Sequence, residues 1–405
     1  MNIVAFNCGS STLKFKLLEV DDHTHPGGER EVAHGTVDRI GDLGAITFLS
    51  GDDRFFEDSL VVPDHGVATE RVINWLHSLP FMKNNTIDAV GHRVVHGGHQ
   101  FSGPVAIDAG VMHAIESLLY LAPLHNDPVL ASMRSARDLM GTSIPMVAVF
   151  DTTFHGTMPE WASSYAIPKD LSLKHRIKRY GFHGLAHKFM AERFVAVTGA
   201  SSKDAKLITL QLGNGCSAAA VSGGYSIDTS MGFTPLEGLM MGTRSGNIDP
   251  HLPAFLARAE GVDIETVEEW LNSKSGLLGV SGLSQDMREL LRAEKEGHRD
   301  AALALEMFCY RVRKEIGACL AVLGGADAVV FGGGIGENAP EVRRRICAGM
   351  EWCGIVLDER KNSEAVGKEM GISSEYSTIQ VHVIPVDEEV IIARDTLRCI
   401  RKEVV

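Results

Sequence analysis

Two stretches of this chain, IVAFNCGSSTLKFKL at residues 3–17 and LITLQLGNGCSAAAV at residues 207–221, align without a gap. Each contains an apolar run, a tight turn of glycine and small polar residues, and a second run. The alignment places Gly9 on Gly213 and Ser11 on Gly215. Each stretch predicts a hairpin whose turn directs backbone N–H groups toward one point, where an anion can bind. The repeat favours a duplicated fold with two phosphate-binding turns facing each other across a cleft; the alternative is two unrelated hairpins.

Length, composition and charge limit the class of protein. The 405 residues are enough for two or three domains. Hydrophobic residues make up 44% and charged residues 22% of the chain, which is typical of a soluble globular protein. The formal net charge of −13 provides no basic field for a nucleic acid or an anionic membrane. An anionic ligand therefore needs a local cluster of cations and N–H donors.

Cysteine usage and the first residues predict a cytoplasmic location. Seven scattered cysteines without a C-x-x-C pair indicate free thiols in a reducing compartment. The opening residues, MNIVAFNCGSSTLKF, lack the basic and apolar regions of a signal peptide. The most apolar segment, at 318–336, contains Asp327 and six glycines. We expect a helix end, a turn, a strand and a glycine loop there, and no membrane span.

Apolar runs alternate with stretches of helical periodicity along the chain. The runs predict buried strands at 2–6, 14–19, 89–95, 145–150, 206–212, 326–331 and 380–385. The periodic stretches predict helices at 128–140, 185–198, 264–273, 301–323, 340–350 and 388–403. This alternation predicts an α/β protein with parallel or mixed sheets covered by helices.

Common nucleotide-binding and hydrolase motifs are mostly lacking. The chain contains neither the G-x-x-x-x-G-K-[ST] loop of P-loop NTPases nor the G-x-S-x-G elbow of hydrolases. Residues 329–346, VVFGGGIGENAPEVRRRI, satisfy a relaxed dinucleotide fingerprint at Gly334, Gly336 and Ala339, with Asp358 further on. A lone fingerprint is a weak signal, so a nicotinamide or flavin site is one alternative. In the other, these glycines let the backbone approach a nucleotide at a helix start.

Polar residues gather in short segments at predicted strand ends and helix starts. The segments are HRVVHGG at 92–98, LAPLHND at 121–127, VFDTTFHGTMP at 149–159, YGFHGLAHKF at 180–189, DTSMGFTPLEGLMMGTRSGNIDP at 228–250, SGLSQDMR at 281–288 and VDEEV at 386–390. A single His or Arg among them is usually a structural residue. Together the segments indicate a ligand site, because ligands collect at the strand ends of α/β sheets.

Taken together, these segments resemble the acetate kinase family, of the acetate and sugar kinase, Hsp70 and actin superfamily. The matching motifs are NCGSSTLKF, HRVVHGG, APLHN, FDTTFHGTMP, YGFHG, LGNG, the whole 228–250 segment, SGLLGVSGLS, GGIGEN and DEEVIIA. They run in order from Asn7 to Ala393, which is nearly the whole chain.

The resemblance implies an α/β fold of two actin-like, ribonuclease H-like domains with a ligand cleft between them. The first domain is expected at 1–151, completed by a C-terminal helix at 388–405. The second is expected at 152–387 and carries the nucleotide pocket. The implied reaction is reversible in-line transfer of the γ-phosphoryl group of ATP to acetate, which gives acetyl phosphate and ADP. Magnesium, or manganese in its place, and a homodimer are also implied.

The resemblance assigns five catalytic residues. Arg93 is expected to hold acetate or its phosphate, His183 and Arg244 to stabilise the transferring group, and His125 to lie nearby. Positive charge is needed because acetate and the phosphoryl group are both anionic. Asp151 is implied as an acid/base or orienting carboxylate. Acetate is already deprotonated at neutral pH, so orienting an arginine is the better physical role.

Binding positions are carried over by the same resemblance. The acyl pocket is expected at Val95, Leu124, Phe182 and Pro235. The first phosphate turn is lined by Ser10, Thr12 and Lys14, and the second by Gln211, Leu212, Gly213, Asn214 and Gly215. The adenosine pocket consists of Asp286, Met287, Arg288, Gly334, Ile335, Gly336, Glu337 and Asn338. Asn7 and Glu388 are expected to hold the magnesium shell, mostly through waters.

Several positions depart from the family pattern. Gln211 stands where the family has His before LGNG, which replaces a cationic donor with a neutral one, so we expect a modest loss of phosphate affinity. Thr12 replaces a Ser, and Val386 with Asp387 replaces a Thr-Asn pair. At Val95 the propionate-preferring relatives tend to have a smaller residue, which favours acetate and makes propionate a poorer substrate.

Three functions remain open at this point. The first is a short-chain carboxylate kinase that prefers acetate, with a propionate kinase as its variant. The second is an actin-like nucleotide switch, which would not need Arg93, Asp151, His183 and Arg244 together. The third is an oxidoreductase that binds a dinucleotide at the 329–346 fingerprint. None of these needs a nucleic acid or a membrane as partner.

Overall fold

The computed structural model describes residues 1–20, 28–51, 55–119 and 123–402, without the side chains of residues 123–125. The chain forms two compact units. Unit 1 consists of Met1–Phe154 and Asp387–Val405, and unit 2 of His155–Val386.

Unit 1 contains an eight-stranded sheet in the order β5-β4-β3-β2-β1-β6-β8-β7. Its strands are β1 (Asn2–Cys8), β2 (Thr12–Glu19), β3 (Arg30–Asp38), β4 (Leu43–Ser50), β5 (Phe55–Val61), β6 (Ala89–Val94), β7 (Val105–Ala106) and β8 (Met146–Phe150). Its helices are α1 (His65–His77), α2 (Ala109–Glu116), α3 (Pro123–Met140) and α15 (Glu388–Arg401), with a 3₁₀ turn at Pro80–Lys83. A second 3₁₀ segment, Asp151–Thr157, follows β8.

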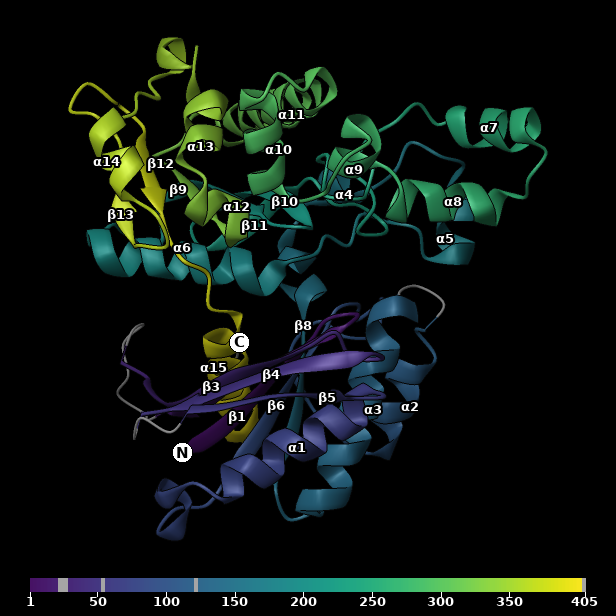
Figure 1. The fold of residues 1–405 in the computed structure, drawn as a ribbon, viewed down its shortest axis with the longest axis vertical. Helices are drawn as coiled ribbons and strands as arrows, with labels where there is room; N and C mark the ends of the chain where they lie inside the picture. The colour runs from purple at the N-terminus through teal and green to yellow at the C-terminus, as the bar shows by residue number, and fades with distance from the viewer. Residues whose placement is uncertain (21–27, 52–54, 120–122, 403–405) are drawn as a thin grey trace. The chain divides into compact units, whose positions relative to one another are not determined.

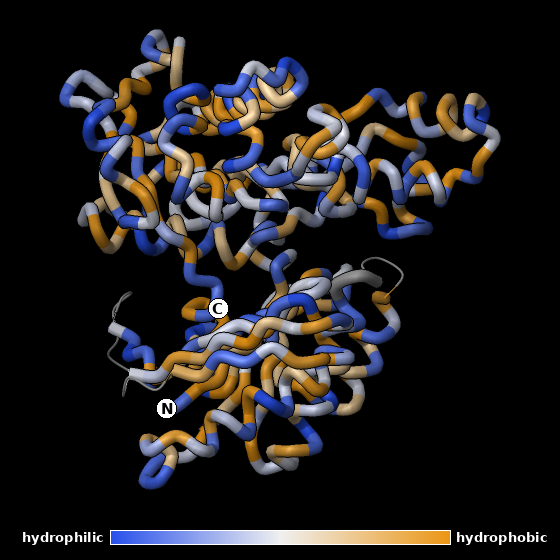
Figure 2. The backbone as a smooth tube through the Cα atoms, viewed as in Figure 1, coloured by the Kyte–Doolittle hydropathy of each residue, from blue (hydrophilic) through white to orange (hydrophobic). Residues whose placement is uncertain are grey.

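Helices cover both faces of this sheet. Alternate residues of a strand point to opposite faces, and Val4 and Phe6 belong to the apolar core that includes residues of α1 and α3. On the other face, a Cβ at Gly91 would lie 2.6 Å from the side chain of Ile392, so α15 packs closely on β6. Figure 1 shows the yellow α15 beside the purple β1, although they are far apart in sequence. In Figure 2, apolar stretches run along the strands of this sheet.

Unit 2 contains a six-stranded sheet in the order β11-β10-β9-β12-β14-β13. Its strands are β9 (Lys206–Leu212), β10 (Cys216–Ser222), β11 (Tyr225–Thr229), β12 (Ala328–Gly332), β13 (Met370–Gly371) and β14 (Gln380–Val383). Its helices are α4 (Glu160–Ser163), α5 (Lys169–His175), α6 (Gly184–Thr198), α7 (Leu252–Glu260), α8 (Ile264–Ser273), α9 (Gly276–Ser281), α10 (Met287–Lys295), α11 (Arg299–Leu323), α12 (Gly333–Asn338), α13 (Pro340–Cys347) and α14 (Glu359–Glu364), with a 3₁₀ turn at Glu351–Cys353.

The two sheets share one core topology. In unit 1 the strands β3-β2-β1 are antiparallel, and β6 and β8 continue the sheet in parallel with β1. In unit 2 the strands β11-β10-β9 are antiparallel, and β12 and β14 continue in parallel with β9. The hairpins β1–β2 and β9–β10 are the two aligned stretches of the sequence. The predicted mixed α/β class and the internal repeat are therefore confirmed.

The glycine loop predicted at the end of the 318–336 segment is wrong, because α12 begins there directly after β12. Gly333 has a φ of +74°, and a Cβ at this position would lie 2.6 Å from the carbonyl O of Leu212. Glycine lets the chain turn here in the left-handed region, after which the next residues wind into a helix. Among the described residues, no helix is long and apolar enough to cross a membrane. All seven cysteines are free thiols.

Candidate active site

Arg93, near the end of β6, is the centre of a charged cluster in unit 1. Its guanidinium donates to both carboxylate oxygens of Asp151, from Nε at 3.0 Å and from Nη2 at 2.6 Å. Nη1 donates to Oδ1 of Asn7 at 2.8 Å and lies 3.1 Å from Oε2 of Glu388. Burial opposes the charge of Arg93, but the surrounding carboxylates, Asp151 foremost, raise its pKa above the usual value. The cluster thus holds a permanently charged and largely buried guanidinium in one orientation.

The start of α15 adds acidic side chains to this cluster. Nδ2 of Asn7 donates to Oε2 of Glu388 at 2.7 Å and to Oε1 of Glu389 at 2.8 Å. Burial raises the pKa of Glu389, and the neighbouring Asp387 and Glu388 add to the effect. Asp387 accepts from the backbone N of Val390 at 3.3 Å and caps the helix. A salt bridge of 2.6 Å from Lys16 to Asp387 fixes this helix start on β2.

The carboxylate of Glu388 and its surroundings fit a magnesium ion that is bound mainly through water. Mg²⁺ prefers oxygen ligands, keeps several waters and takes one or two carboxylates from a protein. Glu388 is 13% exposed and offers such a carboxylate. Oδ1 of Asn7 already accepts from Arg93. Asn7 is therefore better suited to positioning Glu388 than to binding the ion directly. In the described part of the chain, no group of three His, Cys, Asp or Glu forms a metal cage.

The first predicted phosphate turn joins β1 to β2. The backbone N of Gly9 donates to the carbonyl O of Thr12 at 2.8 Å, which closes the turn. Ser10 is exposed and Thr12 is half-buried. Lys14 is exposed and lies directly opposite Asn7 in the strand register. The turn and Lys14 therefore adjoin the Arg93 cluster through Asn7.

The predicted acyl-pocket residues are divided between the units. Val95 follows β6 in unit 1 and is buried. Phe182 is buried in unit 2, where Pro235 is half-buried and its carbonyl O accepts from Nη1 of Arg244 at 3.3 Å. Leu124 and His125 belong to the first turn of α3, and their side chains lie outside the described residues.

His183 precedes α6 in unit 2 with φ +55° and ψ +28°, a region that non-glycine residues seldom adopt. Its Nδ1 is hydrogen-bonded to Oγ of Ser217 on β10 at 2.9 Å. A Cβ at Gly215 would lie 3.2 Å from Cε1 and 3.3 Å from Nε2 of His183, so this edge of the ring faces the β9–β10 turn. A strained backbone that aims a ring at a glycine turn is characteristic of a functional side chain.

Arg244 lies against the same β9–β10 turn. Its Nη1 would be 3.6 Å from a Cβ at Gly215, so Arg244 and His183 both adjoin this glycine. The backbone N of Gly242 donates to the carbonyl O of Asn214 at 2.9 Å and joins the two loops. Burial lowers the pKa of Arg244, although Cys216 opposes the shift. Within the described residues Arg244 has no carboxylate partner, so an anion at this turn would be its counter-ion.

Gln211, which departs from the family pattern, lies at the end of β9 opposite Ser217. Its Oε1 is buried and has no hydrogen-bond partner in the described part of the chain. The adjacent Leu212 is fully buried in the core. Gln211 therefore presents an unsatisfied acceptor where the family's histidine would present a ring nitrogen.

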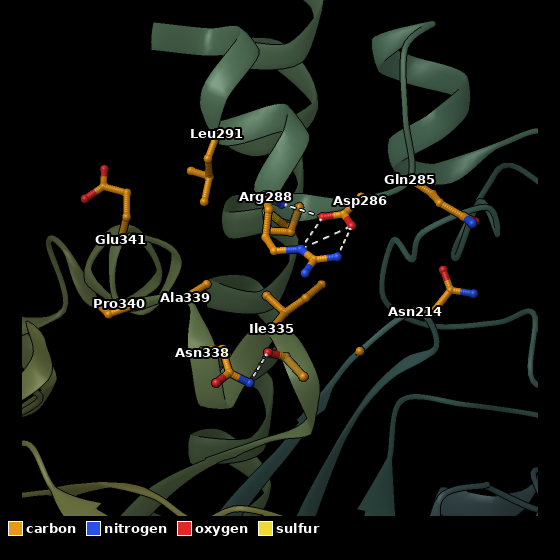
Figure 3. A pocket seen from close by; sticks show the side chains of 13 residues that line it. Asn214, Gln285, Asp286, Arg288, Leu291, Ile335, Asn338, Ala339, Pro340 and Glu341 are labelled. Atoms are coloured by element: carbon orange, nitrogen blue, oxygen red, sulfur yellow. Dashed lines mark hydrogen bonds and ion pairs between the residues drawn. The ribbon is translucent and has the colours of Figure 1, made fainter. Parts of the chain in front are cut away.

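A cavity of about 620 Å³ lies beside the second turn, which is a typical size for a small-ligand site (Figure 3). The residues that line it are Gly213, Asn214, Gln285, Asp286, Met287, Arg288, Leu291, Gly334, Ile335, Asn338, Ala339, Pro340 and Glu341. They come from the β9–β10 turn, the start of α10, α12 and the start of α13. Six of the eight predicted adenosine residues line the cavity, and Gly336 and Glu337 do not. Glu337 instead accepts from the backbone N of Val386 at 3.0 Å.

One wall of this cavity carries a close ion pair. Nη2 of Arg288 lies 2.5 Å from Oδ2 of Asp286, and the pair is visible at the centre of Figure 3. Arg288 lowers the pKa of Asp286 to about 2. Oδ1 of Asp286 also accepts from the backbone N of Arg288 at 2.8 Å, which caps α10. The side chain of Arg288 is 90% exposed, while Leu291 and Ile335 supply apolar surface.

Arg343, on α13, supports the cavity from behind, and no motif in the sequence predicted it. Its side chain is fully buried, and it makes five hydrogen bonds of 2.7–3.1 Å to Asn362 and to the carbonyl oxygens of Gly336, Glu337, Asn362 and Ala365. These bonds satisfy all five N–H donors of the guanidinium without a carboxylate. Three adjacent arginines at 343–345 hide this role in the sequence, because only packing shows which one points inward.

Comparisons with known proteins agree along the whole chain. The sequence model of the acetokinase family matches residues 2–394. A protein of Chloroherpeton thalassium named acetate kinase is 46% identical over 417 residues and is covered completely, as is this chain. The crystal structure of Porphyromonas gingivalis acetate kinase has a TM-score of 0.89 at 41% identity, covering 98% of this chain and 99% of that one. A propionate kinase from Francisella tularensis also has a TM-score of 0.89, at 37% identity with both chains fully covered.

Proposed function

The chain belongs to the acetokinase family, and from this premise we propose that it catalyses reversible phosphoryl transfer from ATP to acetate, giving acetyl phosphate and ADP. The observation that carries the proposal lies within unit 2. A nucleotide-sized cavity ends at the β9–β10 turn, and the same turn is flanked by the half-buried guanidinium of Arg244 and the ring of His183. Cations and N–H donors placed at one end of such a cavity suit the terminal phosphate of a bound nucleotide.

In the proposed reaction, one carboxylate oxygen of acetate forms a bond to the γ-phosphorus. The bond from phosphorus to the β,γ-bridging oxygen breaks, and ADP leaves with that electron pair. No proton has to be removed from acetate at neutral pH. Arg244 and His183 would neutralise and hydrogen-bond the equatorial oxygens of the transferring group. The protein's task is positioning and charge stabilisation, as is general for phosphoryl transfer.

We assign Arg93 to acetate and Asp151 to the orientation of Arg93. The bidentate contact of Asp151 leaves Nη1 of Arg93 to Asn7 and Glu388, so the guanidinium is held on three sides. Ser10, Thr12 and Lys14 would bind phosphate oxygens, and Val95, Phe182, Leu124 and Pro235 would contact the methyl group. His125 would assist the transferring group. Magnesium, held by Glu388 through water, would neutralise charge on the nucleotide phosphates.

The domain assignment, the oligomeric state and the cellular location complete the proposal. Units 1 and 2 would be the two actin-like domains, a proposal that their shared strand order supports. A homodimer follows from the resemblance alone. A cytoplasmic location is supported by the seven free thiols.

The test is a hydroxamate assay that detects acyl phosphate formed from ATP with formate, acetate, propionate or butyrate. We expect acetate to give the highest kcat/KM, with propionate poorer by about tenfold or more, because one methylene changes the binding free energy by about 1–3 kcal/mol. Arg244→Lys should abolish most of the product, whereas Arg258→Lys on the exposed face of α7 should not change it. A higher kcat/KM for propionate would make the chain a propionate kinase.

The same preparation distinguishes a carboxylate kinase from a nucleotide switch and from an oxidoreductase. A nucleotide switch would release ADP at a rate that acetate does not change, as followed in a coupled assay. An oxidoreductase would bind NAD(P)H in a fluorescence titration. Absence of acyl phosphate with every carboxylate would refute the proposed function.

A further inference from the structure

His183 is one end of a hydrogen-bonded chain that leads from the β9–β10 turn into the core of unit 2. Its Nδ1 lies 2.9 Å from Oγ of Ser217, and the same Oγ lies 2.7 Å from Nε2 of His187. The second ring nitrogen of His187, Nδ1, lies 2.7 Å from Oγ1 of Thr209. Ser217, His187 and Thr209 are all completely buried. Four side chains, from α6 and the residue before it, β9 and β10, thus form one continuous hydrogen-bonded chain.

The number of hydrogens in this chain restricts its arrangement. Burial lowers the pKa of His187 well below the usual value, and the neighbouring His155 and His183 add to this, so its ring is neutral. A neutral imidazole donates at one nitrogen and accepts at the other, and a hydroxyl has a single hydrogen to donate. Ser217 therefore cannot donate to both rings, and if it accepted from both, its own hydrogen would have no acceptor among the described residues. Every hydrogen finds an acceptor only when the bonds of this hydrogen-bonded chain all point in the same direction.

The distances select the direction. If His183 is the first donor, Thr209 accepts from His187 and its own hydroxyl hydrogen needs another acceptor. The acceptor available is the carbonyl O of Ala219, which lies 3.5 Å from Oγ1, at the limit of a hydrogen bond. In the other direction the chain uses only its contacts of 2.7–2.9 Å. Thr209 then donates to His187, His187 donates to Ser217, and Ser217 donates to Nδ1 of His183. With Nδ1 as acceptor, a neutral His183 carries its hydrogen on Nε2.

We propose that Ser217 and His187 are positioning residues that keep the hydrogen of neutral His183 on Nε2, the nitrogen that faces the β9–β10 turn. The inference rests on the proposed function in one respect, which is that the transferring phosphoryl group lies at this turn. Nε2–H is then a ready donor to a phosphoryl oxygen, and the ring does not first have to take up a proton. Arg244, which adjoins the same Gly215, supplies the positive charge. The two side chains therefore divide the work of hydrogen bonding and charge neutralisation.

Another serine–histidine contact in unit 2 provides a matched control. Oγ of Ser226 lies 2.8 Å from Nδ1 of His155, and both residues are buried. Nε2 of His155 lies 3.0 Å from the carbonyl O of Phe182. Removing the Ser226 hydroxyl therefore removes the same kind of bond from a buried ring without touching Ser217 or His187.

The experiment combines kinetics with ¹⁵N NMR of the whole protein labelled at histidine, with the His183 signals assigned from a His183→Gln variant. In the wild type we expect His183 to be protonated on Nε2 and not on Nδ1. In Ser217→Ala the hydrogen should be distributed over both nitrogens, and kcat should fall about tenfold or more, as for other lost orienting contacts. The KM values for ATP and acetate should change by less than about twofold, since binding is not affected. Ser226→Ala should keep the wild-type His183 signals and kcat.

Protonation of wild-type His183 on Nδ1 or on both nitrogens would overturn the inference. It would also be overturned if Ser217→Ala left both the spectrum and kcat unchanged. The spectrum is recorded without substrate, so it decides the inference even for a chain that forms no acyl phosphate, a result that would refute the proposed function instead. Should Ser217→Ala not fold by circular dichroism, Thr209→Val removes the first donor with little change of shape, and the same shift of the His183 signals is expected.

Discussion

The contact between Arg93 and Asp151 separates two possible roles for the carboxylate. Both oxygens of Asp151 accept from Arg93, so neither points away from the guanidinium as a free base would. Asp151 is fully buried, and its geometry is that of a group that holds an arginine in place. Acetate, already ionised, has no proton for it to remove. This geometry supports the proposal that the pair acts as one binding element for the carboxylate substrate.

Asp151→Asn tests this role. Asparagine keeps the shape of the contact but removes the charge and replaces one acceptor with a donor, so Arg93 should lose its fixed orientation. We expect the KM for acetate to rise about tenfold, the effect of one charge-assisted hydrogen bond, with a smaller fall in kcat. Steady-state kinetics with varied acetate measure both constants. A loss of kcat by several orders of magnitude at unchanged acetate KM would instead identify a general base.

Gln211→His tests the departure from the family pattern. The buried Oε1 of Gln211 has no partner in the described part of the chain, and a histidine at this position would present a ring nitrogen beside the second phosphate turn. We expect the KM for ATP to fall by about two- to fivefold, within the range of a single net hydrogen bond. Kinetics with varied ATP provide the measurement, and Gln285→His at the cavity wall serves as a comparison. Unchanged constants for ATP would mean that the residue type at 211 does not affect phosphate binding.

The sequence indicated most of the side chains that lie near the β9–β10 turn, because glycine-rich motifs mark places where backbone meets a ligand. It did not indicate Arg343, Ser217 or Thr209. These residues sit in ordinary strand and helix patterns, and their partners are brought to them by packing between elements distant in sequence. Such supporting contacts leave no local signal, since a buried serine with a function and one without look alike in a strand.

Among the elements, the short helix α12 depends on a single glycine. Gly333→Ala would place a methyl group 2.6 Å from the carbonyl O of Leu212 at a φ of +74°. We expect destabilisation of about 1–3 kcal/mol and weaker nucleotide binding, because α12 forms a cavity wall. Urea unfolding and titration with ADP measure the two effects.

Gly317→Ala is the matched control for this substitution. Gly317 lies within α11, and a Cβ there meets nothing within 4 Å. Alanine should stabilise this helix by about 0.5–1 kcal/mol. If both variants behaved alike, the close approach of Gly333 to Leu212 would have no energetic importance.

Strand β6 carries a buried imidazole that makes stability depend on pH. Both ring nitrogens of His92 are buried without a partner among the described residues, and the ring stacks on Phe6 at 5.4 Å. Burial lowers the pKa of His92 to about 3, and Arg137 contributes. An unfolded histidine titrates near 6.5, so between these values the unfolded state binds more protons. The contribution of His92 to the free energy of unfolding is therefore fully present above about pH 6.5 and is lost as the pH falls toward its folded-state pKa.

His92→Leu should flatten this dependence. Between pH 6.5 and 4.5 we expect the wild type to lose about 2 kcal/mol of unfolding free energy through His92, and the variant to lose correspondingly less. Urea unfolding at several pH values measures the difference. His77→Leu, at an exposed position of α1, should keep the wild-type profile. An identical slope in His92→Leu would show that this imidazole is not the titrating group.

The elements predicted from periodicity were those with strong apolar patterns. The helix expected at 264–273 coincides with α8, and the strand expected at 206–212 coincides with β9. Strands β3, β4 and β5 were not predicted. They continue the sheet toward its edge. In β5, which is almost entirely exposed, half of the apolar alternation that identifies a strand is lost. The helix α12 was missed because glycine-rich segments are usually loops.

The oligomeric state of the whole molecule can be measured directly. Large apolar side chains of unit 2 are exposed, including Trp161 at 86%, Leu173 at 60% and Phe255 at 52%. Covering such side chains favours association. We expect light scattering to give a mass of twice 43.8 kDa at micromolar concentration. A mass of 43.8 kDa at every concentration would contradict the proposed homodimer.

The placement of α15 has a consequence for biosynthesis. This helix packs on β1, β6 and β8, so the sheet that begins with the first residues stays uncovered on one face until residues 388–401 have been translated. By then all of unit 2 has been synthesised and can fold from a continuous segment, 155–386. The nascent segment 1–154 would thus expose apolar strand surface, to which chaperones can bind, until α15 packs on its sheet. Synthesis order and completion order are reversed in this chain.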